Sequence, residues 1–247
     1  MELFVDCGNS RLKWVQWQDG CLREQSSLPL AKDFSIADLK QHWLGMNRPR
    51  RVLMANVAGK VIVSQISNWC EQNWGMLPEI LRTKARGYGV VNGYRKPETL
   101  GVDRWLTLIA TRYHYPLPAC IVDCGTALTL DVLESNGRHR GGVICPGLNL
   151  MGQALLERAP GIQATMAEQC LNEILADNTA VALQIGALQA LAGFLERMHE
   201  QLPKLHWIIT GGDAAKIKQE LNFPVQWVPD LLWKGMIIVS QNNEFNQ

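Results

Sequence analysis

Two short stretches of the chain place an aspartate, a glycine and a small hydrogen-bonding side chain at the end of an apolar run. They are residues 4–10 (FVDCGNS) and 121–127 (IVDCGTA). A carboxylate can hold a metal ion, and a glycine lets backbone N–H groups approach phosphate oxygens. Because the pattern occurs once in each half of the chain, it predicts a duplicated fold. The two halves are expected to face each other across a cleft and to offer their loops to one phosphate chain and its metal.

Both loops are predicted to join two strands. Apolar residues alternate after each loop, up to the hairpin signals Asp19-Gly20 and Asn136-Gly137. A P-loop or a Rossmann loop leads from a strand into a helix instead, and neither glycine pattern occurs at these places. Those two modes of nucleotide binding are therefore set aside.

Two further segments end an apolar run in a glycine turn. Residues 207–213 (WIITGGD) predict a strand and turn followed by a helix over 214–221, and the glycines could let the backbone pack against a nucleoside. Residues 141–147 (GGVICPG) end another strand, where the glycine pair allows a ligand or a second segment to come close.

Residues 92–104 (NGYRKPETLGVDR) are the best candidate for substrate binding. This turn-rich loop leads into an apolar helical pattern, so Asp103 and Arg104 fall in the first turn of the helix. In one interpretation Asp103 only caps the helix. In the other it accepts the proton of an attacking hydroxyl, while Arg104 pairs with an anionic group of the substrate. Both can hold, because a carboxylate fixed at a helix end is well positioned.

Composition limits the classes of partner. The 247 residues include 24 basic and 23 acidic side chains, for a net charge of +1, which lacks the basic footprint of a nucleic-acid-binding protein. The seven cysteines form no Cys-x-x-Cys pair, which argues against a disulfide framework or a zinc site. No leader pattern and no apolar run of membrane-spanning length stands out. We expect a cytoplasmic protein with no nucleic-acid and no membrane partner.

The pattern of elements is nearly the same in both halves, as the duplication requires. Pro116 and Pro118 separate the halves, which gives expected subdomains 1–115 and 116–247. A helix over 178–202 carries many small residues, which could pack in the core or against a second subunit. The first half predicts strands 3–6, 11–17, 21–28, 52–56 and 80–82 and helices 36–44, 61–74 and 101–114. The second half predicts strands 119–123, 128–133, 139–144, 206–210 and 225–228 and helices from 148, over 178–202, 214–221 and 231–239.

Six motifs, in order, resemble those of the type III pantothenate kinases, the family that includes the Bvg accessory factor proteins. The resemblance spans nearly the whole chain, and six motifs with suitable spacing make a specific signal. The motifs are residues 6–13 (DCGNSRLK), 101–104 (GVDR), 123–127 (DCGTA), 141–147 (GGVICPG), 178–179 (NT) and 210–213 (TGGD).

The resemblance implies an α/β fold of the duplicated actin-like ATPase type, shared by acetate and sugar kinases, Hsp70 and actin. Each of its two similar subdomains would have a mixed sheet and flanking helices. The implied activity is transfer of the γ-phosphoryl group of ATP to the primary hydroxyl of pantothenate. That is the first step of coenzyme A biosynthesis, carried out by a homodimer with its substrate pocket at the subunit interface.

The resemblance also implies a role for individual residues. The ATP phosphates would be held by Asp6, Cys7, Gly8, Asn9, Ser10, Arg11, Leu12, Lys13 and Thr126. Pantothenate would be bound by Tyr94, Gly101, Val102, Asp103, Arg104 and Thr179, with Asp103 as the general base. Asp123 would bind a monovalent cation, K⁺ or NH₄⁺, and Asp6 would contact the Mg²⁺ of ATP through water.

Two positions depart from the family pattern. Ser10 stands where threonine is commoner, which keeps the hydroxyl, and residues 157–162 (ERAPGI) lack the threonine usual before the proline, so contacts from the helix over 148–162 stay unassigned.

Two other functions fit the same fold. A kinase or phosphohydrolase acting on another small molecule would keep Asp6, Asp123 and the turn at Thr210 but not residues 101–104. A non-catalytic, nucleotide-responsive regulator should lack the base Asp103, which is present.

Overall fold

The computed structural model describes residues 1–30, 34, 36–159, 161–162 and 174–242. By their contacts they form two compact units: unit 1 is Met1–Ala110 with Leu232–Gln247, and unit 2 is Thr111–Leu231. The last helix thus groups with the first half of the chain, whereas the sequence suggested an uninterrupted second subdomain over 116–247. The two subdomains expected from the sequence stay a prediction.

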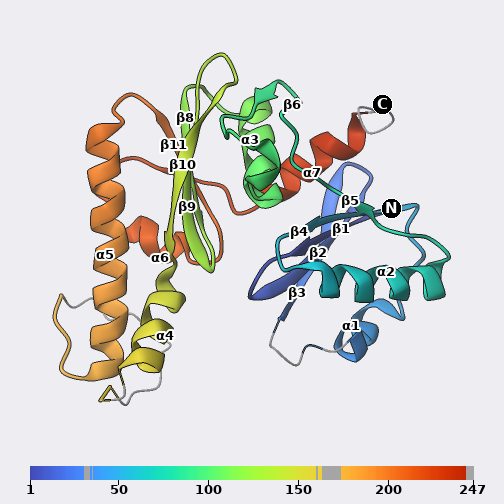
Figure 1. Ribbon diagram of the computed structural model, residues 1–247, viewed down its shortest axis with the longest axis horizontal. Helices are drawn as coiled ribbons and strands as arrows, with labels where there is room; N and C mark the ends of the chain where they lie inside the picture. Colours follow the sequence, from blue (N-terminus) through green and yellow to red (C-terminus); the bar gives the residue numbers. More distant parts are fainter. Residues whose placement is uncertain (31–33, 35, 160, 163–173, 243–247) are drawn as a thin grey trace. The chain divides into compact units, whose positions relative to one another are not determined.

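Unit 1 contains a five-stranded mixed sheet with the order β3-β2-β1-β4-β5 (Figure 1). β1 pairs antiparallel with β2 and parallel with β4. The strands are β1 (Glu2–Cys7), β2 (Arg11–Gln18), β3 (Cys21–Pro29), β4 (Arg51–Asn56) and β5 (Glu79–Ile80). The other elements are α1 (Ile36–Trp43), α2 (Lys60–Trp74), the short hairpin β6 (Arg86–Gly87) and β7 (Val90–Val91), the 3-10 turn η1 (Pro97–Thr99), α3 (Val102–His114), whose last turn belongs to unit 2, and α7 (Leu231–Gln241).

The central strand β1 decides which side of this sheet can bind a ligand. Leu3, Val5 and Cys7 pack with residues of α1 and α2 in one apolar core. Four tryptophans of this core form a cluster, in which the rings of Trp69 and Trp74 are 4.7 Å apart. Because side chains alternate along a strand, Asp6 points to the opposite face of the sheet.

Unit 2 repeats the same sheet. Its order is β10-β9-β8-β11-β12, with β8 antiparallel to β9 and parallel to β11, so the duplication predicted from the sequence is confirmed. The strands are β8 (Ala119–Cys124), β9 (Ala127–Leu133), β10 (His139–Pro146), β11 (His206–Thr210) and β12 (Gln226–Trp227). The helices are α4 (Leu148–Arg158), α5 (Thr179–Gln201) and α6 (Ala214–Gln219).

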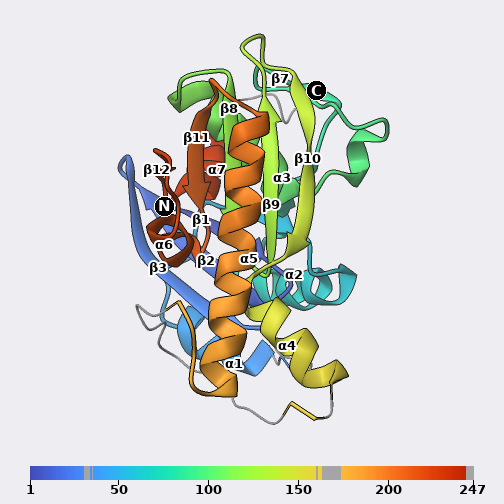
Figure 2. The ribbon, with the colours of Figure 1, turned by 90° about the vertical axis from the view of Figure 1, so that its left-hand side faces the viewer.

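The three helices of unit 2 share one core with the sheet. Leu148 of α4, Leu191 of α5 and Ile217 of α6 pack with Val122 and Cys124 of β8, and Figure 2 shows α5 in front of the strands. Asp123 therefore points to the face away from these helices, as Asp6 does in unit 1. α5 is long and apolar enough to span a membrane by length and composition, but half of that stretch is buried inside the protein, as in a core helix.

The main differences from the sequence expectations are short elements. The hairpin of β6 and β7 and the turn η1 were missed, because strands of two residues carry no periodic signal. The strand expected at 80–82 is instead β5 at Glu79–Ile80.

Candidate active site

The turn between β1 and β2 is the first predicted phosphate loop. The N–H of Gly8 donates to the carbonyl of Arg11 over 3.0 Å, and the register pairs Asp6 with Lys13. Asn9, Ser10 and Arg11 are exposed. A Cβ on residue 8 would lie 3.2 Å from the Arg11 oxygen, which is tight and favours glycine. The loop thus presents exposed residues beside one buried carboxylate.

That carboxylate, Asp6, is held in an unfavourable setting for a charge. It is 5% exposed, and its Oδ2 lies 3.6 Å from Lys13 Nζ. Burial raises the pKa of Asp6 to about 6; the charge of Lys13 opposes the rise, and the charge of Asp103 adds to it. The two acidic residues are therefore electrostatic neighbours within unit 1. Burial raises the pKa of the Cys7 thiol, and the neighbouring charge of Asp6 adds to the rise. Cys7 is therefore an unreactive core residue.

The helix start that carries Asp103 is compact. The Asp103 Oδ1 accepts the N–H of Arg104 over 2.8 Å, as the capping interpretation expects. Gly101 lies under this carboxylate, and a Cβ there would overlap the Asp103 Oδ1. Glycine at 101 is therefore a steric condition for the position of the Asp103 side chain.

Arg104 and Tyr94 form a pair at the same helix start. The Arg104 Nη1 donates to the Tyr94 hydroxyl over 2.9 Å, and the guanidinium carbon lies 5.5 Å from the centre of the Tyr94 ring. Arg104 is only 6% exposed. Both contacts fix the plane of the guanidinium, which a bidentate partner needs. Val102 is buried, so its side chain serves the core.

Three of the sequence motifs meet in unit 2. The N–H of Gly147 donates to the Thr126 carbonyl over 2.9 Å, and that of Asp213 donates to the Cys124 carbonyl over 3.0 Å. Gly211 has φ of +95°, and a Cβ there would lie 2.5 Å from the Asp123 Oδ1. The glycine turns at 147 and 211 thus pack directly against the loop that carries Asp123 and Thr126.

Asn149 and Asp213 were not among the expected site residues, yet both lie at this loop. The Asn149 Nδ2 lies 3.5 Å from the Asp213 Oδ2, and burial raises the pKa of Asp213. Asp213 stands in a motif that the sequence singled out. Asn149, at the start of α4, gives no signal in the sequence.

Thr179 is the first residue of α5 and is exposed. Asn178 caps this helix, since its side chain accepts the N–H of Val181 over 3.0 Å. Thr179 belongs to unit 2, whereas Tyr94 and residues 101–104 belong to unit 1. Their joint role in one substrate site stays a prediction.

The described part of the chain has no group of three or more His, Cys, Asp or Glu residues that could hold a metal ion. Mg²⁺ is commonly bound by one or two carboxylates together with substrate phosphates. A site built on Asp6 and a nucleotide fits that donor set.

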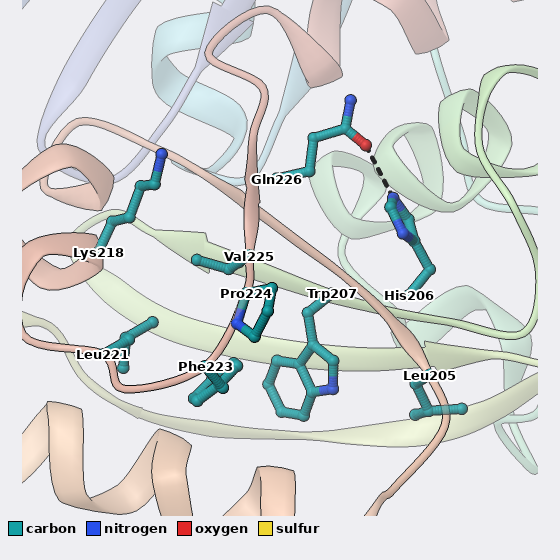
Figure 3. Close-up of a pocket in the computed structure, with 9 residues that line it drawn as sticks. All are labelled: Leu205, His206, Trp207, Lys218, Leu221, Phe223, Pro224, Val225 and Gln226. Carbon is teal, nitrogen blue, oxygen red and sulfur yellow. Dashed lines mark hydrogen bonds between the residues drawn. The ribbon is translucent and has the colours of Figure 1, made fainter.

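A cavity of about 570 Å³ in unit 2 is lined by none of the predicted site residues (Figure 3). Trp207 and Phe223 form its apolar wall, and His206 and Gln226 bond to each other over 2.8 Å at its edge. The cavity borders the first residues of β11, whereas Asp123 pairs with Thr210 at the last. It has no carboxylate and no glycine turn, so it does not suit a metal-bound triphosphate.

Comparison with known proteins decides the family. The family model described as type III pantothenate kinase matches residues 2–201. A type III pantothenate kinase of Nitrosococcus oceani is 38% identical over 98% of this chain and 94% of its own length. The chain belongs to the type III pantothenate kinase family. The resemblance seen in the six motifs is thereby confirmed.

Solved structures agree on the fold of this family member. A Baf family protein from Campylobacter jejuni has a TM-score of 0.59 at 22% identity, with 98% of each chain covered. Component A of the (R)-2-hydroxyglutaryl-CoA dehydratase of Acidaminococcus fermentans has a TM-score of 0.52 at 11% identity, covering 95% of this chain and 93% of its own. With two mixed sheets of the same order, the chain has the duplicated actin-like ATPase fold.

Proposed function

We propose that this chain is a pantothenate kinase that transfers the γ-phosphoryl group of ATP to the primary hydroxyl of pantothenate, the first step of coenzyme A biosynthesis. Family membership supports the reaction. The assignment of the site is supported by the Arg104–Tyr94 pair beside Asp103 and by the charge of Asp103, which helps to raise the pKa of Asp6. A phosphate-binding carboxylate, a base and an anion-binding arginine are the parts that this reaction needs.

Asp103 is the general base in this proposal. Its carboxylate accepts the proton of the pantothenate hydroxyl as the oxygen attacks the γ-phosphorus. The backbone N–H of Arg104 and the steric limit set by Gly101 hold that carboxylate in place. Arg104 pairs with the carboxylate of pantothenate, because its planar fork can make two parallel hydrogen bonds. Tyr94 orients the fork, and Thr179 completes the substrate site.

The nucleotide phosphates are assigned to residues 6–13 and to Thr126. Phosphoryl transfer depends mostly on aligning the reacting groups and on compensating the charge of the phosphates. Backbone N–H donors and fixed cations are the groups that supply this alignment and compensation. Lys13, 3.6 Å from Asp6, supplies one fixed positive charge. Asp6 would hold the Mg²⁺ of the nucleotide through water, and the charge of that ion would offset the acidic pair of Asp6 and Asp103.

Asp123 is assigned to a monovalent cation, K⁺ or NH₄⁺. A Cβ built on Gly211 would lie 2.5 Å from the Asp123 Oδ1, and one built on Gly125 would lie 3.7 Å from it, so the main chain of both glycines runs close to this carboxylate. Carboxylate oxygens are ligands that suit a hard cation. Asp123 would hold the cation, whose charge would lower the repulsion between this carboxylate and the phosphates.

A homodimer is supported by the surface of unit 2. The edge strand β10 exposes Val143 and Ile144, and α4 exposes Leu150 and Leu155. On α5, Gly186 and Gly193 face open space, with no heavy atom within 4 Å of a Cβ built there. An exposed edge strand, apolar side chains and a helix with small residues suit close packing against a second copy of the same surface.

The free thiols support a cytoplasmic location. The six cysteines in the described residues are all free, and Cys170 lies outside them. Free thiols are typical of a reducing compartment, and the near-neutral net charge of +1 favours no nucleic-acid partner.

The test is a coupled kinase assay with purified protein, ATP, Mg²⁺ and K⁺. Pantothenate should give one ADP and one 4'-phosphopantothenate per turnover, and unrelated primary alcohols should give none. ATP turnover with another alcohol but not with pantothenate would favour a different small-molecule kinase of the same fold. ATP binding without any turnover would favour the regulator.

A further inference from the structure

Asn92 is a buried polar residue that none of the assignments above uses. It is 9% exposed and lies between β7 and η1, in the loop that leads to the helix start at residues 101–104. Its own backbone N–H donates to the carbonyl of Ala85 over 3.0 Å. A buried amide in a surface loop needs partners for both its oxygen and its nitrogen, and here it finds both.

The side chain of Asn92 connects three points of this loop. Its Oδ1 accepts the N–H of Tyr94 over 3.0 Å. Its Nδ2 donates to the carbonyl of Pro97 over 3.2 Å and lies 3.4 Å from that of Lys84. The bond to the residue two positions later is an Asx turn, and the two contacts of Nδ2 close the loop around it.

Tyr94 links Asn92 to Arg104. The Asn92 Oδ1 fixes the backbone of Tyr94, the Tyr94 hydroxyl accepts from Arg104 Nη1 over 2.9 Å, and the Tyr94 ring lies beside the guanidinium. Movement of the Tyr94 backbone would therefore turn or release the Arg104 fork. A bidentate pair loses most of its strength when the fork is turned.

We propose that Asn92 is a positioning residue for recognition of the substrate carboxylate, acting through Tyr94 on Arg104. The inference rests on the proposed function, because Arg104 is taken to pair with the carboxylate of pantothenate. It explains why an amide stands at position 92. An aspartate would keep the acceptor for Tyr94 but would place a negative charge against the carbonyls of Lys84 and Pro97.

The test compares pantothenate with pantothenol, in which a hydroxymethyl group replaces the carboxylate. Asn92→Ala should lower kcat/KM for pantothenate about tenfold, which corresponds to about 1.4 kcal/mol, mainly through a higher KM. The kcat/KM for pantothenol and the KM for ATP should change less than about twofold. Asn92→Ser, whose hydroxyl can still accept the Tyr94 N–H, should recover part of the loss.

The control is Asn136→Ala, because the Asn136 Oδ1 accepts the N–H of Arg138 over 2.9 Å in the same type of turn on an exposed hairpin. Asn136→Ala should leave the ratio of kcat/KM for pantothenate to kcat/KM for pantothenol unchanged. A double-mutant cycle of Asn92→Ser with Tyr94→Phe gives a second measure that does not need the alanine variant to fold. The two effects should be far from additive if Asn92 acts through the Tyr94 hydroxyl.

Two results would overturn the positioning role while leaving the proposed function intact. One is an Asn92→Ala enzyme with the full preference for pantothenate over pantothenol. The other is an Asn92→Ala enzyme in which kcat/KM falls equally for pantothenate, pantothenol and ATP, which would mean a general structural role. Additive effects in the double-mutant cycle would mean the same. A wild-type protein that does not phosphorylate pantothenate would instead refute the proposed function itself.

Discussion

Asp6 at the end of β1 and Asp103 in the first turn of α3 are close enough that the charge of one helps to raise the pKa of the other. The positive charge of Lys13 and its hydrogen bond to Asp6 act in the opposite direction and lower the pKa of Asp6. An acidic pair of this kind is unfavourable in the protein alone and becomes favourable once cations arrive. This pair therefore supports the proposal that a metal-bound nucleotide, which brings positive charge, binds beside Asp6.

The role of Asp103 is tested by Asp103→Asn. The amide cannot accept the proton of the hydroxyl, so kcat should fall between about 10² and 10⁴-fold in the coupled assay. Titration calorimetry should show nearly unchanged ATP binding. Asp38→Asn is the matched control, because Asp38 is also acidic and in the first turn of a helix, α1, where it is exposed. Full activity of Asp103→Asn would remove the residue from the role of base.

The pKa of Asp6 predicts how stability depends on pH in the metal-free protein. The folded pKa of about 6 lies above the ordinary value of 3.8, so the folded state binds this proton more tightly. The contribution of Asp6 to stability is then present below about pH 3.8 and is lost as the pH rises through about 6.

Asp6→Asn should therefore make the metal-free protein more stable than wild type at pH 8, by up to about 3 kcal/mol. The difference should vanish near pH 4. Urea unfolding at the two pH values measures both, and Asp38→Asn should show no comparable change. A less stable Asp6→Asn protein at pH 8 would contradict the buried, destabilised carboxylate.

Gly101→Ala should impair the position of Asp103 without unfolding the protein. The new Cβ meets the end of a flexible side chain, so Asp103 rotates away while the helix stays. We expect a drop of at least about tenfold in kcat and an unchanged melting temperature within about 2 °C, measured by the kinase assay and by calorimetry. Gly45→Ala, at a site with no atom within 4 Å of the new Cβ, should be neutral in both.

Gly211→Ala should weaken the monovalent cation site. Its Cβ would lie 2.5 Å from the Asp123 Oδ1, and alanine rarely adopts φ near the observed +95°. The concentration of K⁺ that gives half-maximal activity should rise at least about tenfold, as one misplaced ligand group implies. Gly212→Ala is the adjacent control, since a Cβ there meets nothing within 4 Å. Equal K⁺ dependence of both variants would argue against Asp123 as the cation ligand.

The dimer surface is tested by Ile144→Asp. Ile144 on the edge strand β10 is 60% exposed, and a charge buried at an interface is costly. Light scattering should give a dimer for the wild type and a monomer for the variant, with loss of activity if the substrate pocket lies at the interface. Val61→Asp changes a side chain of α2 that is 75% exposed and should leave the dimer intact. If Ile144→Asp stays dimeric, the dimer interface must lie on another surface of the protein.

Much of the fold could be predicted from the sequence because its signals are local. The two strand–turn–strand repeats around Asp6 and Asp123 depend on glycine turns and alternating side chains within a few residues. The two-residue strands β6 and β7 were missed for the opposite reason, since so short a segment has no period. The grouping of α7 with unit 1 has no local signal, because it depends on contacts such as that of Gly235 with the backbone of Leu106.

The sequence alone determined which residue types stand at each turn and helix start, and through six ordered motifs it determined the family. Only the tertiary structure decided which of these residues meet. Asp6 and Asp103 are brought together in unit 1, Gly211 and Gly147 close on the loop of Asp123, and Asn92 reaches Tyr94 and the carbonyl of Pro97. Burial, repulsion between like charges and the space for a single Cβ are properties of contacts between distant segments. They exist only after the chain has folded.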